Sequence, residues 1–378
     1  MALLEVENLS HAFSEKQLYK DSSFELYKGE HMGIVGQNGT GKSTLIKILL
    51  KEILPDKGTI KWQNNTTIGS LDQYAVTEGD MTIFNYLRTA FERLYKINDE
   101  LTKLYEEMAE NYSESIMNKV DKYQEILSEE NFYGIDSTIL KVTSGLGINA
   151  MGMDTCLKNL SGGQRAKVIL AKLLLQNPDV LILDEPTNFL DKEHIEWLSE
   201  YLQSFKGAFI IVSHDYDFLE KVTTCICDIE FNKIKKYRGS YSSFLKQKGA
   251  LREEYIRQYE SQQKEIKKLE DYIAKNKVRA STAQMAKSRE KKLNKIERLE
   301  KPSFTSKPHI HFTAIESSVQ VVLEVNKLEV GYYYPLLPKM KFEVRNGEKL
   351  VITGFNGIGK STLLKTLMGQ IPAISGEF

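Results

Sequence analysis

Apolar residues along the chain follow two periods, one typical of buried strands and one typical of amphipathic helices. Short apolar runs at 31–35, 180–183 and 208–212 are each followed by a turn and then by a helical pattern. This succession of buried strands and helices predicts an α/β core. Alternating apolar and polar residues at 3–13 and 22–30 predict a small antiparallel sheet that leads into this core.

The chain contains an internal repeat. Residues 29–60 and 347–378 align without a gap at an offset of 318, and 15 of the 32 aligned positions are identical. Each copy predicts a buried strand (31–35 or 349–353), a glycine-rich turn and a helix (42–50 or 360–368). A strand pair at 323–333 and 340–348 precedes the second copy. We therefore expect two copies of one domain, the second ending at the position equivalent to Ile60 and less stable than the first.

A different kind of sequence, rich in Lys, Glu and Gln, lies between the two copies. Its apolar residues form one helical stripe from Phe244 to Ile273 and a second at Leu293, Ile296 and Leu299, which predicts a helical hairpin with its tip within 274–284. Residues 241–310 carry a net charge of +9, whereas residues 79–150, also largely helical, carry −6. A basic run of this kind is either a solvated helix face or a surface for an anionic partner.

Composition excludes little else. Lys+Arg and Asp+Glu both number 51, so the overall charge indicates no anionic partner. The apolar runs are too short to span a bilayer and the N-terminus has no leader pattern, so we expect a cytoplasmic protein. Cys225 and Cys227 alternate along a strand-like segment. They could belong to a zinc site, but no second Cys/His pair is evident, and buried strand positions are favoured.

The glycine-rich turn of each copy has the pattern of a phosphate-binding loop. Gly36, Gly39 and Gly41 permit close backbone approach, so that successive N–H groups can surround phosphate oxygens. Lys42 can then reach the β and γ phosphates, and the Ser43 hydroxyl can bind Mg²⁺. The first loop comprises Gly36, Gln37, Asn38, Gly39, Thr40, Gly41, Lys42, Ser43 and Thr44. The positions predicted to bind nucleotide in the second are Gly354, Asn356, Gly357, Gly359, Lys360, Ser361 and Thr362.

Two further segments fit a nucleotide site. Asp184, at the carboxyl end of the apolar strand, can hold Mg²⁺, and the adjacent Glu185 can polarise an attacking water. Ser161, Gly162, Gly163 and Gln164 precede a predicted helix and form a second anion-facing helix start. A single nucleotide rarely needs two such devices, so we expect this one to serve the γ-phosphate of a nucleotide held by another domain.

These residues resemble the motifs of the ATP-binding cassette superfamily. The loop at 36–44 resembles its Walker A motif, 160–164 its signature, 180–185 its Walker B motif and 188–191 its D-loop. His214 resembles its switch histidine and Gln73 its Q-loop glutamine, a further metal contact. The resemblance implies two cassettes that enclose two ATP molecules with Mg²⁺. It also places Phe13 and Tyr332 where the family stacks adenine, although both could be ordinary strand aromatics.

Tandem cassettes, a basic helical linker and an acidic helical arm resemble the ABC-F family of translation factors. The resemblance implies a nucleotide-binding domain at 1–240 with a helical arm at about 79–150, a linker at 241–312 and an incomplete second domain at 313–378. It further implies that the ATP-bound protein acts on the ribosome, with the linker in the tRNA exit site. The candidates for contact with rRNA and tRNA are Lys275, Lys277, Arg279, Lys287, Arg289, Lys291 and Lys292.

Other functions share the nucleotide motifs. The chain could be the ATPase subunit of a membrane transporter, a structural ATPase on DNA, or a relative that protects the ribosome from antibiotics, although its short linker tip favours a role in translation. The second copy has no Q-loop, signature, Walker B motif or switch histidine in this sequence. We therefore expect the chain to bind nucleotide but to hydrolyse it poorly, unless two first cassettes dimerise.

Overall fold

The structure is a computed structural model that describes residues 2–13, 16–71, 80–110, 113–276, 283–299, 320–354 and 357–378. Contacts group residues 1–241 with 317–378, and set residues 242–316 apart. We describe three segments separately: the N-terminal segment (2–241), the linker segment (242–299) and the C-terminal segment (320–378).

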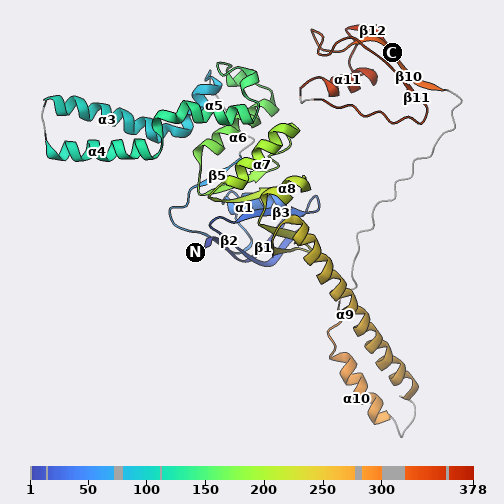
Figure 1. Ribbon diagram of the computed structural model, residues 1–378. Coiled ribbons are helices and arrows are strands. Elements are labelled where there is room, and N and C mark those ends of the chain that lie inside the picture. The colour runs from blue at the N-terminus through green and yellow to red at the C-terminus, as the bar shows by residue number, and fades with distance from the viewer. Residues whose placement is uncertain are drawn as a thin grey trace. The chain divides into compact units, whose positions relative to one another are not determined.

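A six-stranded sheet forms the centre of the N-terminal segment (Figure 1). Its strand order is β5-β6-β7-β3-β8-β9, and every pair is parallel except β8 with β9. The strands are β3 (His31–Gly36), β5 (Ile68–Ser70), β6 (Val180–Asp184), β7 (Ala208–Val212), β8 (Cys225–Glu230) and β9 (Lys233–Arg238). All residues of β7 and the first four of β6 are buried, as expected for central strands that are covered on both faces.

A three-stranded antiparallel sheet packs on this core, and the alternating pattern predicts its first two strands but not the third, which follows α1 in the chain. Its order is β2-β1-β4, formed by β1 (Ala2–Phe13), β2 (Lys16–Tyr27) and β4 (Lys57–Trp62). Leu4 and Val6 of β1 point to the same face as Leu26 of β2 and are buried with it. This face, helix α1 (Lys42–Leu49) and the six-stranded sheet share one hydrophobic core.

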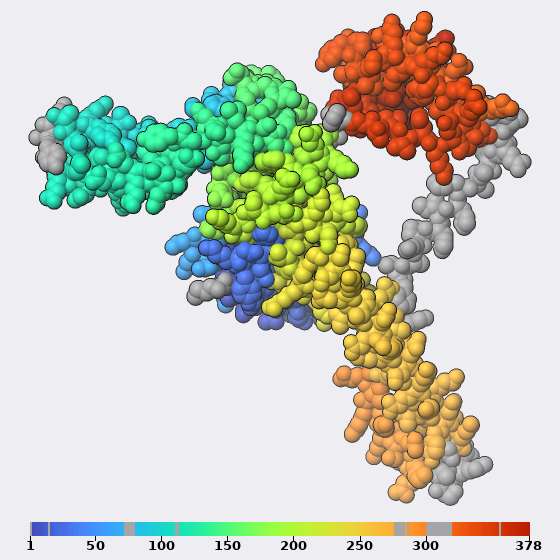
Figure 2. All heavy atoms as spheres, viewed as in Figure 1, coloured from blue at the N-terminus to red at the C-terminus, as the bar shows by residue number. Residues whose placement is uncertain are grey.

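Helices supply the rest of the N-terminal segment. Helices α3 and α4 pack side by side as an arm that extends away from the sheets (Figures 1 and 2). The α-helices are α2 (Ile83–Arg88), α3 (Glu92–Glu110), α4 (Glu114–Glu129), α5 (Ile135–Gly145), α6 (Gly162–Gln176), α7 (Lys192–Ser204) and α8 (Tyr216–Val222). Short 3-10 turns are η1 (Thr89–Phe91), η2 (Phe132–Gly134), η3 (Asn149–Met151) and η4 (Leu157–Asn159).

The linker segment contains the two predicted helices, α9 (Tyr241–Asn276) and α10 (Ala283–Asn294). Ile266 and Leu269 of the predicted stripe are buried. The second helix is shorter than predicted, because it ends before Ile296 and Leu299. Gln262 of α9 binds the backbone there instead, donating to the Glu297 carbonyl and accepting from the Leu299 N–H, each at 2.8 Å. These bonds replace those that a longer helix would make.

The C-terminal segment repeats part of this fold. A three-stranded sheet of order β11-β10-β12 packs with helix α11 (Lys360–Leu367) around Val325, Leu328, Val330 and Leu363. The strands are β10 (Val321–Glu329), β11 (Met340–Arg345) and β12 (Ser375–Glu377).

The strand predicted at 349–353 is wrong. These residues form no strand, and Leu350 and Val351 are 52% and 79% exposed. The equivalent strand β3 is hydrogen-bonded on one side to β7 and on the other to β8. Among residues 320–354 and 357–378, no strand pairs with 349–353, so its backbone lacks the partners that a buried strand needs.

None of the helices in the described part of the chain combines the length and apolar character needed to cross a lipid bilayer.

Helices α5 and α7 are in tight contact at Gly145 and Trp197, and this contact leads to a prediction about stability. A Cβ atom added to Gly145 would lie 2.0 Å from the Trp197 ring, so either α5 or the indole must move. We expect Gly145→Ala to destabilise the protein by about 1–3 kcal/mol, as overpacking usually does. Urea unfolding followed by tryptophan fluorescence and circular dichroism measures the change.

Gly249→Ala is the matched control. Gly249 lies in helix α9, and a Cβ atom added there would meet no atom of the described residues within 4 Å, so alanine should be neutral or slightly stabilising. Equal stability of Gly145→Ala and the wild-type protein would contradict the proposed close contact.

Candidate functional site

The loop between β3 and α1 has, at two positions, a left-handed backbone that favours glycine. Gly39 and Gly41 have φ values of 79° and 97°, in the left-handed region. A Cβ atom on Gly41 would lie 2.5 Å from the hydroxyl oxygen of Tyr19, which donates a hydrogen bond to the Gly41 carbonyl. Lys16 also holds the loop, since its Nζ donates to the Gly39 carbonyl at 2.7 Å. Strand β2 therefore shapes this loop from outside.

Lys42 is the first residue of α1 and folds back over the loop. Its Nζ donates to the carbonyls of Gly36 at 2.9 Å and Gln37 at 3.3 Å. Partial burial lowers the pKa of Lys42, while the charges of Glu185 and Asp184 act in the opposite direction. The ammonium group therefore lies within the electrostatic range of both carboxylates that the sequence singles out.

The remaining residues of the loop differ in what their side chains do. The Thr40 hydroxyl donates to the Gln37 carbonyl at 2.9 Å and closes a turn that includes Asn38. Ser43 lies exposed in the first turn of α1, and Thr44 is half-buried. Ser43 is therefore the hydroxyl in this turn that is most open to a metal ion or an anion.

Glu185 follows β6 in a strained conformation. Its φ of 49° is left-handed, which is uncommon for a residue with a side chain, and its N–H donates to the Val212 carbonyl at 2.9 Å. Burial is the main cause that raises the pKa of Glu185, and the nearby His214 partly offsets it. Oε1 is buried and accepts no hydrogen bond from the residues that the structure describes. An uncompensated buried acceptor is costly and favours a role with an incoming donor.

His214 lies beside Glu185, between β7 and α8. Its backbone N–H donates to Glu185 Oε2 at 3.3 Å, and its ring Nε2 lies 3.5 Å from Oε1, while half of the side chain is exposed. Asp184, the last residue of β6, is half-buried. The structure thus brings Lys42, Asp184, Glu185 and His214 together at the carboxyl ends of β3, β6 and β7.

The segment 161–164 begins helix α6. The Ser161 hydroxyl accepts a hydrogen bond from the Gln164 N–H, and Gln164 Oε1 accepts one from the Ser161 N–H, which together form a capping box. Gly162 and Gly163 lie in the first turn and leave its backbone accessible. This helix start has the partial positive charge that favours an anion.

A buried polar cluster with one ion pair, Lys167 with Asp191, connects this helix to α7 and was not predicted from the sequence. Lys167 Nζ and His194 Nδ1 lie 3.7 Å and 3.6 Å from Asp191 Oδ2, and all three side chains are largely buried. The cluster connects α6, the segment 188–191 and α7. The one available signal is that Lys167 interrupts a buried apolar run in α6.

The second loop repeats the local geometry of the first. Lys360 Nζ donates to the Gly354 carbonyl at 2.6 Å, and Gly359 before α11 has a φ of 111°. Ser361 and Gly357 are exposed, and Thr362 is buried. Phe13 and Tyr332 are 68% and 61% exposed, so both rings are accessible for stacking.

Four of the predicted site residues, Gln73, Lys277, Arg279 and Asn356, lie outside the described residues. Among the linker cations, Lys275, Lys287 and Lys291 are exposed. Two others contact α9: the Arg289 guanidinium lies 4.3 Å from the centre of the Tyr272 ring, and Lys292 pairs with Glu265 at 2.8 Å. All five are exposed, and the last two also contact α9 within the hairpin.

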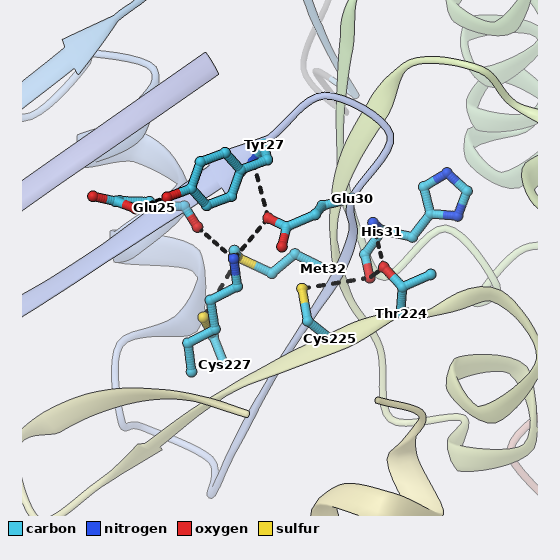
Figure 3. Close-up of polar contacts among 9 residues, drawn as sticks. Glu25, Tyr27, Glu30, His31, Met32, Thr224, Cys225 and Cys227 are labelled. Atoms are coloured by element: carbon cyan, nitrogen blue, oxygen red, sulfur yellow. Dashed lines mark hydrogen bonds and ion pairs between the residues drawn. The ribbon is translucent and has the colours of Figure 1, made fainter. Parts of the chain in front are cut away.

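Cys225 and Cys227 occupy buried positions on β8, which confirms the strand interpretation (Figure 3). The Cys227 Sγ lies 3.4 Å from Met32 Sδ, and the Cys225 thiol points to the His31 carbonyl. Burial raises the pKa of Cys225 to about 11 and also raises that of Cys227. Both are therefore inert thiols at neutral pH.

Comparison with known proteins identifies relatives along the whole chain. A family model described as ABC transporter matches residues 19–188 and 337–378, and a second model with the same description matches 227–312. The chain is 40% identical to the uncharacterized ABC transporter ATP-binding protein YfmM of Bacillus subtilis, over all of this chain and 73% of that protein.

Two other relatives are longer. The putative ATP-binding protein YdiF of Bacillus subtilis is 38% identical over all of this chain and 60% of its own length. ABC transporter F family member 5 of Arabidopsis thaliana is 33% identical over 99% of this chain and 55% of its own length. The chain thus spans little more than half the length of these two proteins.

The partly buried carboxylate of Glu185 predicts a pH-dependent stability. Because burial raises the pKa of Glu185, its contribution to stability is present below the unfolded pKa, near 4.3, and is lost as pH rises through the folded value. We expect Glu185→Gln to be more stable than the wild-type protein at pH 7.5, by about 1 kcal/mol, because glutamine places no charge at this position. The gap should close towards pH 4. Denaturant unfolding without nucleotide or Mg²⁺ measures it.

Glu92→Gln is a control of opposite sign. The hydrogen bond from Lys96 lowers the pKa of Glu92, so its contribution is present at pH 7.5 and is lost as pH falls through the folded value. Glu92→Gln should therefore lose stability slightly at pH 7.5. An equal effect of Glu185→Gln at pH 4 and pH 7.5 would rule out charge burial as the cause.

Proposed function

The chain belongs to the ATP-binding cassette family, and from this premise we propose that it binds ATP with Mg²⁺ at residues 36–44 and hydrolyses it. The observation that carries the proposal is the convergence of Lys42, Asp184, Glu185 and His214 at one edge of the parallel sheet. This edge is where open α/β sheets bind their ligands.

The side chains present fit ATP and Mg²⁺. The loop offers backbone N–H groups and the Lys42 ammonium to the phosphates, and Ser43 and Asp184 supply the hard oxygen ligands that Mg²⁺ prefers. Gln73 is proposed as a further ligand and Phe13 as the residue that stacks on adenine. When bound, Mg²⁺ would neutralise charge on the phosphate oxygens.

Glu185 is proposed as the residue that orients the attacking water and accepts its proton. Its buried Oε1 accepts no hydrogen bond from the described residues, and its raised pKa makes the carboxylate a better base than an exposed glutamate. His214 lies close enough to hold this carboxylate in place through its backbone N–H. The left-handed backbone of Glu185, directly after β6, sets the direction in which its side chain leaves the strand.

The helix start at 161–164 is proposed to bind the γ-phosphate of a nucleotide held by another cassette. Its accessible first turn and dipole suit an anion, whereas the Ser161 and Gln164 side chains already cap the helix. The other cassette would be either a complete second repeat or a second copy of this chain.

We propose the ribosome as the partner of the ATP-bound protein, with the linker reaching the tRNA exit site. An F-family protein is among the relatives, and a family model covers 227–312, which includes the basic linker. The exposed Lys275, Lys287 and Lys291 can contact the phosphates of rRNA or tRNA without reading sequence. Nucleotide binding would then stabilise the complex and hydrolysis would release it in the cytoplasm.

ATP binding is tested by Lys42→Ala. Loss of the ammonium should weaken binding of Mg²⁺-ATP by about 30-fold or more, because a close charge pair in the site is lost. Titration with a fluorescent ATP analogue measures the affinity. Lys47→Ala, on an exposed position of the same helix, should bind within about twofold of the wild-type protein. Unchanged binding by Lys42→Ala would remove residues 36–44 as the nucleotide site.

Ribosome binding is tested by reversing two exposed charges in α10. The double variant Lys287→Glu/Lys291→Glu should bind 70S ribosomes at least about tenfold more weakly with ATP, and its log K against log salt slope should be shallower by about 2. Lys103→Glu/Lys119→Glu, on exposed arm positions, makes the same change in net charge and should bind as the wild-type protein does. Co-sedimentation at several salt concentrations measures both.

Assays on the same wild-type protein distinguish the alternative functions. Wild-type protein that stays in the supernatant with ATP but co-purifies with a membrane protein would favour a transporter subunit. Tight binding of duplex DNA at physiological salt would favour a structural ATPase on DNA. ATP-dependent release of a ribosome-bound antibiotic would assign protection in place of a role in translation.

A further inference from the structure

Two stacked tyrosines connect the segment that contains His214 to the start of helix α9. The rings of Tyr216 and Tyr241 stack with centroids 4.9 Å apart and planes 11° from parallel. Tyr216 comes two residues after His214 and begins α8, whereas Tyr241 begins α9. Strands β8 and β9 separate the two tyrosines in the sequence, so the fold brings these two helix starts together.

The segment that carries Tyr216 is firmly held. Ser213 is buried beside Thr187, and its hydroxyl accepts a hydrogen bond from the Asp215 N–H at 3.0 Å. Asp215 caps α8 by accepting from the Phe218 N–H at 3.0 Å. His214 lies within this segment and contacts Glu185, so the segment connects the site directly to Tyr216.

The segment that carries Tyr241 is also held by a backbone hydrogen bond. Gly239, after β9, has a left-handed φ of 101° and donates its N–H to the Thr224 carbonyl at 2.8 Å. Helix α9 then runs for 36 residues, about 54 Å at 1.5 Å per residue. A change of about 5° in its direction at Tyr241 moves the far end, near Lys275, by about 5 Å. A small change at the stack is therefore large at the end of α9.

We propose that Tyr216 and Tyr241 are positioning residues that couple the state of the Glu185–His214 pair to the direction of helix α9. The coupling rests on the proposed function, because it transmits nucleotide binding to a linker that contacts RNA. A stacked aromatic pair shifts a two-state equilibrium by about two- to tenfold, enough to bias the linker without locking it. Neither tyrosine touches the nucleotide in this scheme.

The test uses the full chain with one spin label on α9, at Ser261→Cys, and one on α7, at Glu200→Cys, both exposed positions. Cys156 is replaced by serine, while Cys225 and Cys227 are buried and unreactive. Pulsed electron–electron double resonance measures the distance between the two labels with and without Mg²⁺-ATP. A fluorescent ATP analogue measures affinity in the same samples.

We expect Mg²⁺-ATP to shift the distance distribution of the wild-type protein and of Tyr216→Phe, which keeps the ring. Tyr216→Ala and Tyr241→Ala should bind Mg²⁺-ATP with an affinity within about twofold of wild type. Their ATP-dependent shift in the distance distribution should be about two- to tenfold smaller. The double variant should lose no more than either single variant, because both remove one contact. Leu245→Ala, an exposed position one turn further along α9, should behave as wild type.

Three results would overturn the coupling. They are a full shift in Tyr216→Ala, additive losses in the double variant, and a wild-type protein that binds Mg²⁺-ATP without any shift. A wild-type protein that does not bind Mg²⁺-ATP would instead refute the proposed function, and the coupling with it. Affinity and distance together therefore distinguish the two failures.

Discussion

Parallel pairing of β6, β7 and β3 is the constraint on which the candidate site depends. Asp184 pairs with Val212 across β6 and β7, and Val212 pairs with Ile34 across β7 and β3. Parallel strands in this register end at one edge, so the phosphate loop, Glu185 and His214 emerge side by side although up to 180 residues separate them.

The two copies of the loop separate what is local from what is tertiary. Both loops have a left-handed glycine before the helix and a lysine that donates to the first glycine carbonyl, although only the first follows a paired strand. The turn chemistry alone therefore specifies the loop, and the sequence predicts it from glycine and lysine spacing. A buried strand also needs neighbours on both sides, and that is why the same apolar pattern forms β3 at 31–36 and no strand at 349–353.

Other differences from the sequence predictions have the same origin. Gln262 binds backbone groups 35 and 37 residues away, which ends α10 earlier than its apolar stripe indicates. Lys167, Asp191 and His194 form their cluster across three elements, and no spacing rule connects them. By contrast, the acidic pair at the end of β6 was predictable, because an apolar strand that ends in carboxylates is a local pattern. What fails is the prediction of contacts between polar groups distant in the sequence.

Charge repulsion and specific packing act in opposite directions between helices α9 and α10 of the linker. Its excess of positive charge repels α10 from α9, and the pairs Lys292–Glu265 and Arg298–Glu270 are exposed, so each offsets little of this repulsion. The buried Ile266 and Leu269 and the two hydrogen bonds of Gln262 supply the more specific part of the association. A polyanion that contacts Lys287 and Lys291 would reduce the repulsion between the helices. The proposed binding to RNA would therefore stabilise the hairpin, since any ligand that prefers the packed helices shifts the equilibrium towards them.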